Sequence, residues 1–387
     1  MKKYFKEFDY PLFITYVALC LFGLIMVYSS SMMVAVNKLN LEPDYFYKKQ
    51  IFNIIIAFIA FFIGCFIPYK RYRNNKFILI MLVSTFVLLI LVHLIGYSPD
   101  GSGAKSWLKF SFASFQPSEL AKISIIIYFS VVFANKNSSG TIDSIMNSLL
   151  PPMFIYGLAV ASIAMEPDIG SIILLTLIAF SVIAVSGLSI KKFIISMTTV
   201  FLIGVGVIGT ALLFFKDTLL TEKRMGRIEA FWDPFKDITN YGWQVVNGYY
   251  AIGAGGIPGL GLGQSIQKLG YLPEPHTDFI LAIISEELGT LGVLFVIGGL
   301  GFIVLRGIIV GIRAKDPMAR MLAVGIASWI GFQTFVNIGG LSGLIPLTGV
   351  PLPFISYGGS SLMLLSLAMG ILVNVSMFVK KDRNKLK

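Results

Sequence analysis

Long apolar segments recur along the whole 387-residue chain, and they limit its fold more than any other feature. Apolar runs of about 18 or more residues are typical of membrane-spanning helices. Inside lipid only helices and closed barrels satisfy their own backbone hydrogen bonds, and continuous rather than alternating runs favour helices. Composition agrees, since 56% of the residues are hydrophobic and only 13% are charged. We therefore predict an all-α integral membrane protein.

The apolar runs define about ten transmembrane helices, each bounded to within a few residues. The first run starts at Pro11 and is longer than the roughly 7–15-residue core of a signal peptide, so we expect it to be retained. We predict a single polytopic membrane domain over residues 1–387, with a large extracytoplasmic loop at 216–277 between the seventh and eighth helices. The predicted spans are 11–33, 50–67, 77–97, 117–134, 148–165, 169–187, 193–215, 278–304, 321–345 and 356–379.

Basic residues concentrate on one side of the predicted helices, the side that also holds both termini. Cytoplasmic loops are enriched in Lys and Arg, so we expect both termini in the cytoplasm. The formal net charge of +11 is then a topology signal, and because the basic residues are dispersed we predict no nucleic-acid partner. The basic residues on this side include Lys2, Lys3, Lys6, Lys70, Arg71, Arg73, Lys191, Lys192, Arg306, Arg313, Lys315, Arg320, Lys380, Lys381 and Arg383.

The large loop differs from the short ones because it combines charges, aromatic rings and glycines. A connection of this length is usually functional, and amphipathic rings suit a position on the membrane surface. Arg224 and Arg227 are candidate anion contacts, because arginine binds phosphate bidentately. Alternatively, they pair with Glu222 and Glu229 on a solvated face. The glycine stretch 251–263 matches no phosphate-loop motif, and we interpret it as a flexible or re-entrant connection.

Asp278 lies where this loop meets the eighth span, within YLPEPHTDFILAIISEELG. A carboxylate that touches water while partly desolvated suits a general base. The alternative is a helix cap, a role open to Thr277 or Asp278. Glu286 lies about 12 Å further along a helix, so these acids cannot form a paired-carboxylate site. For Glu286 and Glu287 we predict structural pairing inside the bundle.

Other polar groups interrupt the apolar spans near the same face. In QPSELAK, Glu119 and Lys122 are three residues apart and would meet on one helix face. In MEPDIGS, Glu166 and Asp168 lie either in a tight turn between two helices or at a break in one helix. The motif ISYGGSS opens the last span with small polar residues that a lipid-facing helix does not need. Together with Asp278, these segments predict a polar cavity open to the outer side.

Several motifs are highly specific, namely GAKSWLKF, FQPSELAKI, EPDIGS, RIEAFWDPFKD, AIGAGGIPGLGLGQSIQKLGYLPEPHTDFILAIISEELG and ISYGGSS. Over essentially the whole chain they resemble the SEDS family (shape, elongation, division and sporulation), and most closely its division members. The resemblance implies ten transmembrane helices and an inverting glycosyltransferase that polymerises lipid II into β-1,4 glycan strands of peptidoglycan at the outer face of the cytoplasmic membrane. It also implies septal cell-wall synthesis, with a class B penicillin-binding protein transpeptidase and other divisome membrane proteins as partners.

The resemblance also implies roles for residues. The family's essential aspartate corresponds to Asp278, its charged pair to Glu119 and Lys122, and its loop tryptophan to Trp107. We expect Asp278 to take the proton of the attacking GlcNAc 4-hydroxyl. The departing undecaprenyl pyrophosphate needs arginines or a divalent cation, Mg²⁺ or Mn²⁺, whose ligands the sequence does not identify. The candidates for substrate or pyrophosphate binding are Arg224, Arg227, Trp107, Lys105, His276, Ser356 and Ser360.

Two other functions compete with polymerisation. A lipid II flippase would also place polar groups within its spans, but it needs access from both faces, and the polar, aromatic and glycine features here concentrate on the outer side. A scaffold that only recruits the transpeptidase would leave Asp278 without a task. The sequence therefore favours the polymerase.

Overall fold

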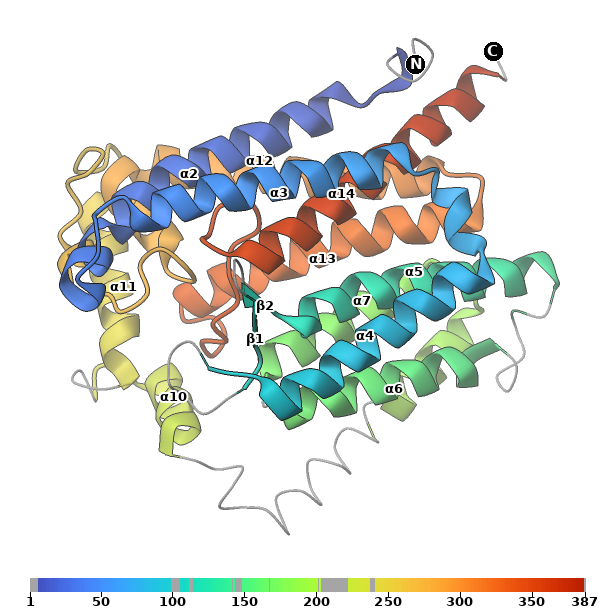
Figure 1. Ribbon diagram of the computed structural model, residues 1–387, viewed down its shortest axis with the longest axis horizontal. Helices are drawn as coiled ribbons and strands as arrows, with labels where there is room; N and C mark the ends of the chain where they lie inside the picture. Colours follow the sequence, from blue (N-terminus) through green and yellow to red (C-terminus); the bar gives the residue numbers. More distant parts are fainter. Residues whose placement is uncertain are drawn as a thin grey trace.

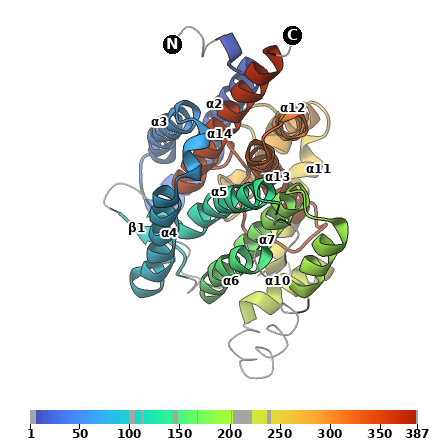
Figure 2. The same ribbon diagram turned by 90° about the vertical axis from the view of Figure 1, so that its right-hand side faces the viewer.

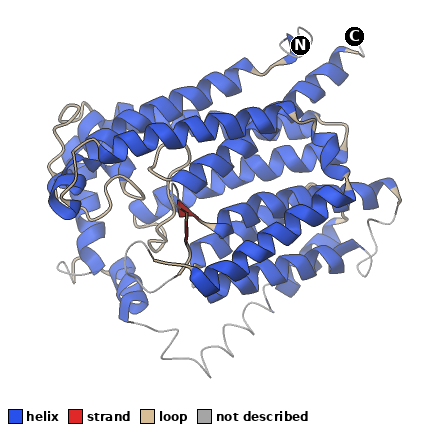
Figure 3. Cartoon of the chain, viewed as in Figure 1, coloured by secondary structure: helices blue, strands red, loops and turns tan. Residues whose placement is uncertain are grey.

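The computed structural model describes residues 6–98, 105–110, 114–140, 142, 148–166, 168–200, 202, 222–236 and 241–385. Nearly all of the regular structure in these residues is helical (Figure 3). The described sheet is a small antiparallel hairpin, in which β1 (Leu108–Lys109) pairs with β2 (Ser114–Phe115). The predicted all-α fold class is confirmed.

Most of the predicted spans coincide with helices. The described residues contain seven helices that are long and apolar enough to cross a membrane, and two shorter apolar ones. The seventh predicted span, 193–215, falls largely outside the described residues, although 190–200 are helical. The long helices are α2 (Tyr10–Leu39), α3 (Tyr45–Phe66), α4 (Asn75–Ile95), α5 (Pro117–Ser138), α12 (Ile280–Arg313), α13 (Pro317–Leu341) and α14 (Gly359–Asn384), and the shorter ones are α6 (Leu150–Met165) and α7 (Ile169–Ala184).

The helices pack into one bundle (Figure 1). Helix α14 runs along α3, α2 packs on α3 and α12, and α13 packs on α12, α5 and α7. Helix α2 begins and α14 ends at the same end of the bundle (Figures 1 and 2). We call this end, which holds Asp9 and Asn384, the terminal end, and we call the opposite end, which holds Asp278, the site end. An even number of crossings is consistent with this arrangement.

Small residues allow the backbones of α3 and α14 to touch. A Cβ atom placed on Gly370 would lie 2.0 Å from the carbonyl oxygen of Phe61. A Cβ atom on Gly64 would lie 2.5 Å from the carbonyl oxygen of Leu367. Helices in lipid gain most of their association energy from close packing, so any side chain at either glycine would separate the two helices.

Buried polar contacts fix the terminal end. Arg306 of α12 donates two hydrogen bonds, at 2.9 and 3.2 Å, to Oδ1 of Asp9, which is only 4% exposed. The Ser376 hydroxyl of α14 donates to the other carboxylate oxygen of Asp9. A second contact, from Arg73 to Asp316 at 2.9 Å, joins the turn after α3 to the start of α13. These contacts tie the start of the first helix to α12 and α14, and the turn after α3 to α13.

Helix α12 is broken at Gly289. The φ and ψ angles of Gly289 are 63° and −159°, outside the helical region. The segment after α11 fits into this break, since Leu260 N donates to Glu286 O and Gly261 N donates to Glu287 O, each at 2.9 Å. The eighth span, predicted at 278–304, is confirmed as a helix, but the break within it was not predicted, because glycine is common within transmembrane helices and does not by itself mark a break.

The segment predicted as a large loop contains helices. Helix α10 (Glu222–Trp232), helix α11 (Tyr241–Gly255) and the short 3₁₀ helix η3 (Gln267–Leu269) all lie within 216–277. Helix α11 packs on α12, where a Cβ atom on Gly248 would be 2.8 Å from the Phe279 ring. The segment 251–263, interpreted from the sequence as a flexible or re-entrant connection, is a helix end followed by a turn that is docked on α12.

Candidate active site

Asp278 lies just before α12 and is surrounded by the segment 342–358, which joins α13 to α14. Backbone and side-chain hydrogen bonds hold the two together. The Ser356 hydroxyl donates to Thr277 O at 2.6 Å, and Tyr357 N donates to His276 O at 2.9 Å. The segment itself is fixed in the bundle, because Phe354 is 2% exposed and its ring meets that of Tyr16 edge-on at 5.2 Å.

The carboxylate of Asp278 shares a hydroxyl group with a second acid. The Thr277 hydroxyl lies 2.9 Å from Oδ1 of Asp278 and 3.3 Å from Oε2 of Glu274. On the other side, a Cβ atom on Gly349 would be 3.9 Å from Oδ2 of Asp278. Phe279, rather than Thr277 or Asp278, occupies the N-cap position of α12. The arrangement suits proton transfer better than the capping role that the sequence left open.

His276 is a neutral group in the wall next to Asp278. Its side chain is 4% exposed and lies between aromatic rings, 4.4 Å from Phe46 and 5.5 Å from Tyr357 between centroids. Burial, and then the positive charge of Lys38, lower its pKa from 6.5 to about 4. Its Nδ1 atom has no hydrogen-bond partner. At neutral pH the imidazole therefore carries no charge and retains one unused polar atom.

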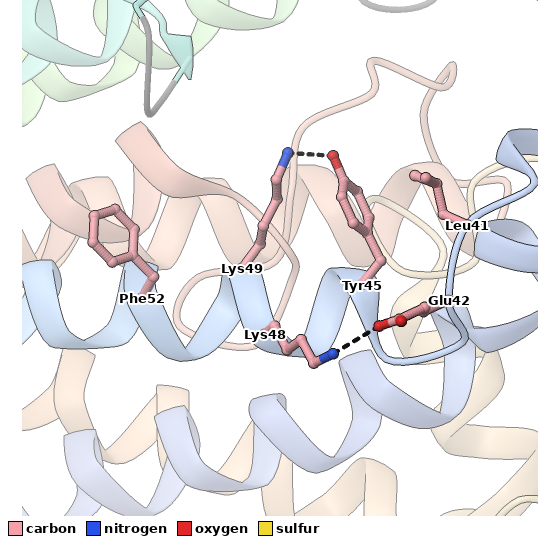
Figure 4. Close-up of a pocket in the computed structure, with 6 residues that line it drawn as sticks. All are labelled: Leu41, Glu42, Tyr45, Lys48, Lys49 and Phe52. Atoms are coloured by element: carbon pink, nitrogen blue, oxygen red, sulfur yellow. Dashed lines mark hydrogen bonds and ion pairs between the residues drawn. The ribbon is translucent and has the colours of Figure 1, made fainter.

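A pocket of about 450 Å³ opens at the start of α3 (Figure 4). In Figure 4 the Lys49 ammonium group donates a hydrogen bond to the Tyr45 hydroxyl, and the Lys48 ammonium group donates one to the Glu42 carboxylate. The lining combines apolar and charged side chains, as a lipid with a charged headgroup requires. Its residues are Leu41, Glu42, Tyr45, Lys48, Lys49 and Phe52.

Glu166 and Asp168 lie in a turn between α6 and α7, which decides between the two structures predicted for MEPDIGS. Asp168 caps α7 through Ser171 N at 2.9 Å and accepts from Gln116 Nε2 at 3.0 Å. Glu166 is 1% exposed, and neither of its carboxylate oxygens has a partner. Burial, with a contribution from Asp168, raises its pKa from 4.5 to about 9. A Cβ atom on Gly170 would lie 2.9 Å from the Val350 side chain, so the start of α7 packs on the segment that contacts Asp278.

Glu119 and Lys122 form a buried ion pair in α5, with 2.6 Å between Nζ and Oε1. Their exposed fractions are 3% and 1%. The ammonium group also lies 5.7 Å from the centroid of the Trp329 ring. Trp329 Nε1 donates to Gln333, and Gln333 Nε2 donates to Pro351 O, both at 2.9 Å. The pair thus connects through α13 to the segment around Asp278.

The two glutamates of α12 each have structural partners, and they share Ser265. Glu287 accepts from Lys268 at 2.6 Å and from the Ser29 hydroxyl at 2.7 and 2.8 Å. Among the described contacts, Glu286 accepts from the Ser265 hydroxyl and from Ile266 N at 2.9 Å, and none of these donors is a cation. The two acids therefore hold the docked turn and η3 against the first part of α12.

The structure distributes the other sequence candidates over several elements. Trp107 pairs through its backbone with Tyr97, and Lys105 next to it is exposed. Ser106 between them donates to Glu166 O at 3.3 Å, so this stretch packs against the turn that holds Glu166. Arg227 is exposed on α10, the Arg224 side chain lies outside the described residues, and Ser360 accepts a hydrogen bond from Gln116 N at 3.3 Å.

Several residues of the site were missed by sequence reasoning. Trp329, Gln333 and Asn337 recur at four-residue intervals in an apolar span, and this spacing could have revealed them as one polar face. The roles of Lys268 and Glu274 carried no comparable signal. Both lie in the loop before α12, where no periodic pattern relates them to their partners.

The described acids offer a partial fit to a divalent cation. Among the described residues, no group of three His, Cys, Asp or Glu side chains could hold a metal ion. Glu274 and Asp278, however, place two carboxylates around one hydroxyl group. Mg²⁺ is commonly bound by one or two carboxylates together with substrate phosphates, so these two acids fit such an ion once a pyrophosphate is present.

Comparison with known proteins gives consistent matches over the full length. The chain is 46% identical to the probable peptidoglycan glycosyltransferase FtsW of Bacillus subtilis, covering 100% of this chain and 95% of the relative. It is 35% identical to the protein of the same description from Geobacter metallireducens, covering 98% and 97%. These alignments include the whole of the site described above.

Solved structures share the fold. A chain from a peptidoglycan synthase complex that coordinates polymerization and crosslinking superposes with a TM-score of 0.76 at 23% identity, covering 96% of this chain and 98% of that one. The crystal structure of the rod shape determining protein RodA of Thermus thermophilus gives a TM-score of 0.65 at 22% identity, covering 97% of each. The family model described as cell cycle protein matches residues 10–381. The chain belongs to the FtsW/RodA/SpoVE family of cell cycle proteins.

Proposed function

We propose that this protein is a peptidoglycan glycosyltransferase that polymerises lipid II into β-1,4 glycan strands for septal wall synthesis in cell division. The observation that carries the proposal is the position of Asp278, at the end of a membrane bundle and beside a second acid. The family membership and the names of the full-length relatives support the same reaction.

Asp278 is the general base of this reaction. The GlcNAc 4-hydroxyl oxygen of one lipid II attacks C1 of the lipid-linked MurNAc that ends the growing strand. The new C1–O4 bond forms while the bond from C1 to the pyrophosphate oxygen breaks, and the hydroxyl proton passes to the carboxylate. Attack opposite the leaving group inverts the anomeric centre and gives the β linkage.

The leaving pyrophosphate requires positive charge. Glu274 and Asp278 would hold a divalent cation, Mg²⁺ or Mn²⁺, which supplies electrostatic stabilisation of the departing pyrophosphate. Arg224 and Arg227 of α10 are the candidate arginines of this chain. Lys49, beside the pocket at the start of α3, is a further cation within the same end of the bundle. The apolar lining of that pocket suits the start of the polyprenyl chain.

The protein is a multi-pass membrane protein, and we place its site end outside the cell. Basic residues cluster at the terminal end, on Arg73, Arg306, Arg313 and Arg383, and cytoplasmic ends are enriched in such residues. Both termini are then cytoplasmic and the site faces the compartment where strands are polymerised. The plasma membrane at the division septum is the location that fits this role.

A class B penicillin-binding protein is the proposed partner, because new strands must be crosslinked where they emerge. One solved structure of the same fold belongs to a complex that coordinates polymerization and crosslinking. Other divisome membrane proteins complete the assembly.

Polymerisation of lipid II by the purified protein with its cognate transpeptidase tests the function. Wild type is compared with Asp278→Asn and with Asp382→Asn, a matched change of an exposed aspartate at the terminal end. We expect strands from wild type and Asp382→Asn, no strands from a folded Asp278→Asn, and loss of activity with chelator. Equal strand formation by Asp278→Asn refutes the base. Leaflet exchange of lipid II in liposomes, without polymerisation by any variant, would establish the flippase instead. The absence of both activities would favour the scaffold that only recruits the transpeptidase.

A further inference from the structure

One face of α13 carries three side chains with polar groups in a largely apolar span. Trp329, Gln333 and Asn337 are spaced by four residues, so they point to the same side of the helix. Their exposed fractions are 0%, 0% and 5%. Polar groups inside a membrane span normally bind one another or the backbone of a neighbour, and here they follow one line toward Asp278.

Asn337 uses both hydrogens of its amide on backbone carbonyl groups. Nδ2 donates to Asp278 O and to Val350 O, each at 2.8 Å. The backbone N–H groups of Ala282 and Ile283, in the first turn of α12, donate to Phe279 O instead. The amide of Asn337 therefore anchors the backbone of Asp278 just before the helix begins.

The same amide fixes the opposite wall of the site. Val350 follows Gly349, and Gly349 is the residue next to Oδ2 of Asp278. Gln333 adds a second anchor one residue further on, at Pro351 O. Side chains of α13 thus hold both the backbone of Asp278 and the backbone that faces its carboxylate. Movement of Asn337 would therefore change the distance between these two parts of the site.

We infer that Asn337 is the positioning residue for Asp278 in the glycosyl transfer reaction. This inference rests on the proposed function, since it assigns Asn337 the task of holding the base at the attacking hydroxyl. It does not require Asn337 to touch the substrate. A misplacement of about 1 Å lowers the rate of such a step by about a hundredfold, which is the effect expected when the anchor is removed.

Asn374 provides a matched control. It is also a fully buried asparagine that bridges two backbone groups, since Tyr69 N donates to its Oδ1 at 3.0 Å and its Nδ2 donates to Cys65 O at 2.6 Å. It lies near the terminal end, where α3 ends. Asn337→Ala and Asn374→Ala therefore remove equivalent structural contacts, and only the first is near Asp278.

The experiment measures kcat and KM for lipid II polymerisation, with melting curves for every variant. We expect Asn337→Ala to lower kcat about a hundredfold and to change KM less than about threefold. Asn374→Ala should lose a similar amount of thermal stability and keep kcat within about threefold of wild type. If Asn337→Ala does not fold, Asn337→Gln keeps the amide but displaces it by one methylene group, and the same fall in kcat is expected.

Three results with the asparagine variants overturn the inference. The first is a folded Asn337 variant with wild-type kcat, and the second is an Asn374→Ala protein that loses as much kcat as Asn337→Ala. A rise in KM that alone explains the lost activity would assign Asn337 to substrate binding. Asp278→Asn with wild-type kcat would overturn the proposed function and the positioning role together, whereas an inactive Asp278→Asn beside active Asn337 variants overturns the positioning role alone.

Discussion

Replacing Glu287 with glutamine is expected to destabilise the protein strongly, because it leaves a buried lysine without its counter-ion. Glu287 is 0% exposed, and the side chain of its partner Lys268 is 6% exposed. The ion pair joins η3 to α12, and the Ser29 hydroxyl of α2 contacts both charged groups. Breaking one partner of a buried pair lowers the free energy of unfolding by about 3–5 kcal/mol.

The remaining contacts of Lys268 indicate how large this loss of free energy of unfolding should be. After Glu287→Gln, Lys268 still contacts the Ser29 hydroxyl at 2.9 Å, so we expect a loss near the lower limit, about 3 kcal/mol. Lys268→Met should lose a similar amount, about 3 kcal/mol, since the carboxylate keeps Ser29. The double variant has no unpaired charge, so its loss should be no more than about 3 kcal/mol, well below the sum of the single losses, which gives a coupling of at least about 3 kcal/mol between the two sites.

Denaturant unfolding in detergent micelles measures the three free energies. Lys48→Met is a suitable control, because Lys48 belongs to an exposed pair whose loss should leave stability unchanged. Losses below about 1 kcal/mol for both single variants, or effects that add within about 0.5 kcal/mol, would show that the pair does not hold the docked turn in place.

Three further predictions concern the break in α12 and two titrating groups. Gly289→Ala should lower the melting temperature strongly, because a Cβ atom would lie 2.1 Å from Ile257 O, whereas Gly298→Ala, with open space around it, should leave it unchanged. The raised pKa of Glu166 means that the folded state binds more protons than the unfolded state, so stability falls as the pH rises from 4.5 to about 9. In Glu166→Gln the melting temperature should depend less on pH across this range. An unaltered dependence of the melting temperature on pH would contradict the burial of the acid. The lowered pKa of His276 acts in the opposite direction, so stability falls as the pH drops from 6.5 to about 4. His276→Phe should remove this fall in the melting temperature at acid pH.

The spans could be predicted because lipid imposes a length and a composition on every crossing helix. Helices α10 and α11 were missed because they lie in a segment rich in glycine and charge, where no apolar run marks a helix. Contacts with α12 stabilise α11, including the approach of Gly248 to the Phe279 ring. Such tertiary contacts override the weak local propensity of a glycine-rich sequence.

The site was predictable where a single residue stands out, and less so where backbone groups are the partners. Asp278 was chosen as the candidate base from its position at the start of a span and from the family resemblance, and its catalytic role stays a prediction. The i, i+3 spacing of Glu119 and Lys122 predicted their meeting. Lys268 could not be assigned to Glu287, because 19 residues and a turn separate them. The anchors of Asn337 are carbonyl groups, which every residue has, so no side-chain pattern records them.

The contacts between the first and last helices have a consequence for biogenesis. The Tyr16 hydroxyl of α2 donates to Ser366 of α14 at 2.8 Å, across 350 residues of sequence. Asp9 meets Ser376 across 367 residues, and its other partner, Arg306, is also made late. During synthesis α2 therefore enters the membrane long before its buried polar groups have partners, and the bundle closes only when α14 arrives. A ribosome-bound chain arrested before Gly359 should accordingly remain open to protease at sites that the finished protein protects. The last helix to insert, α14, is therefore the one that completes the packing of the site end.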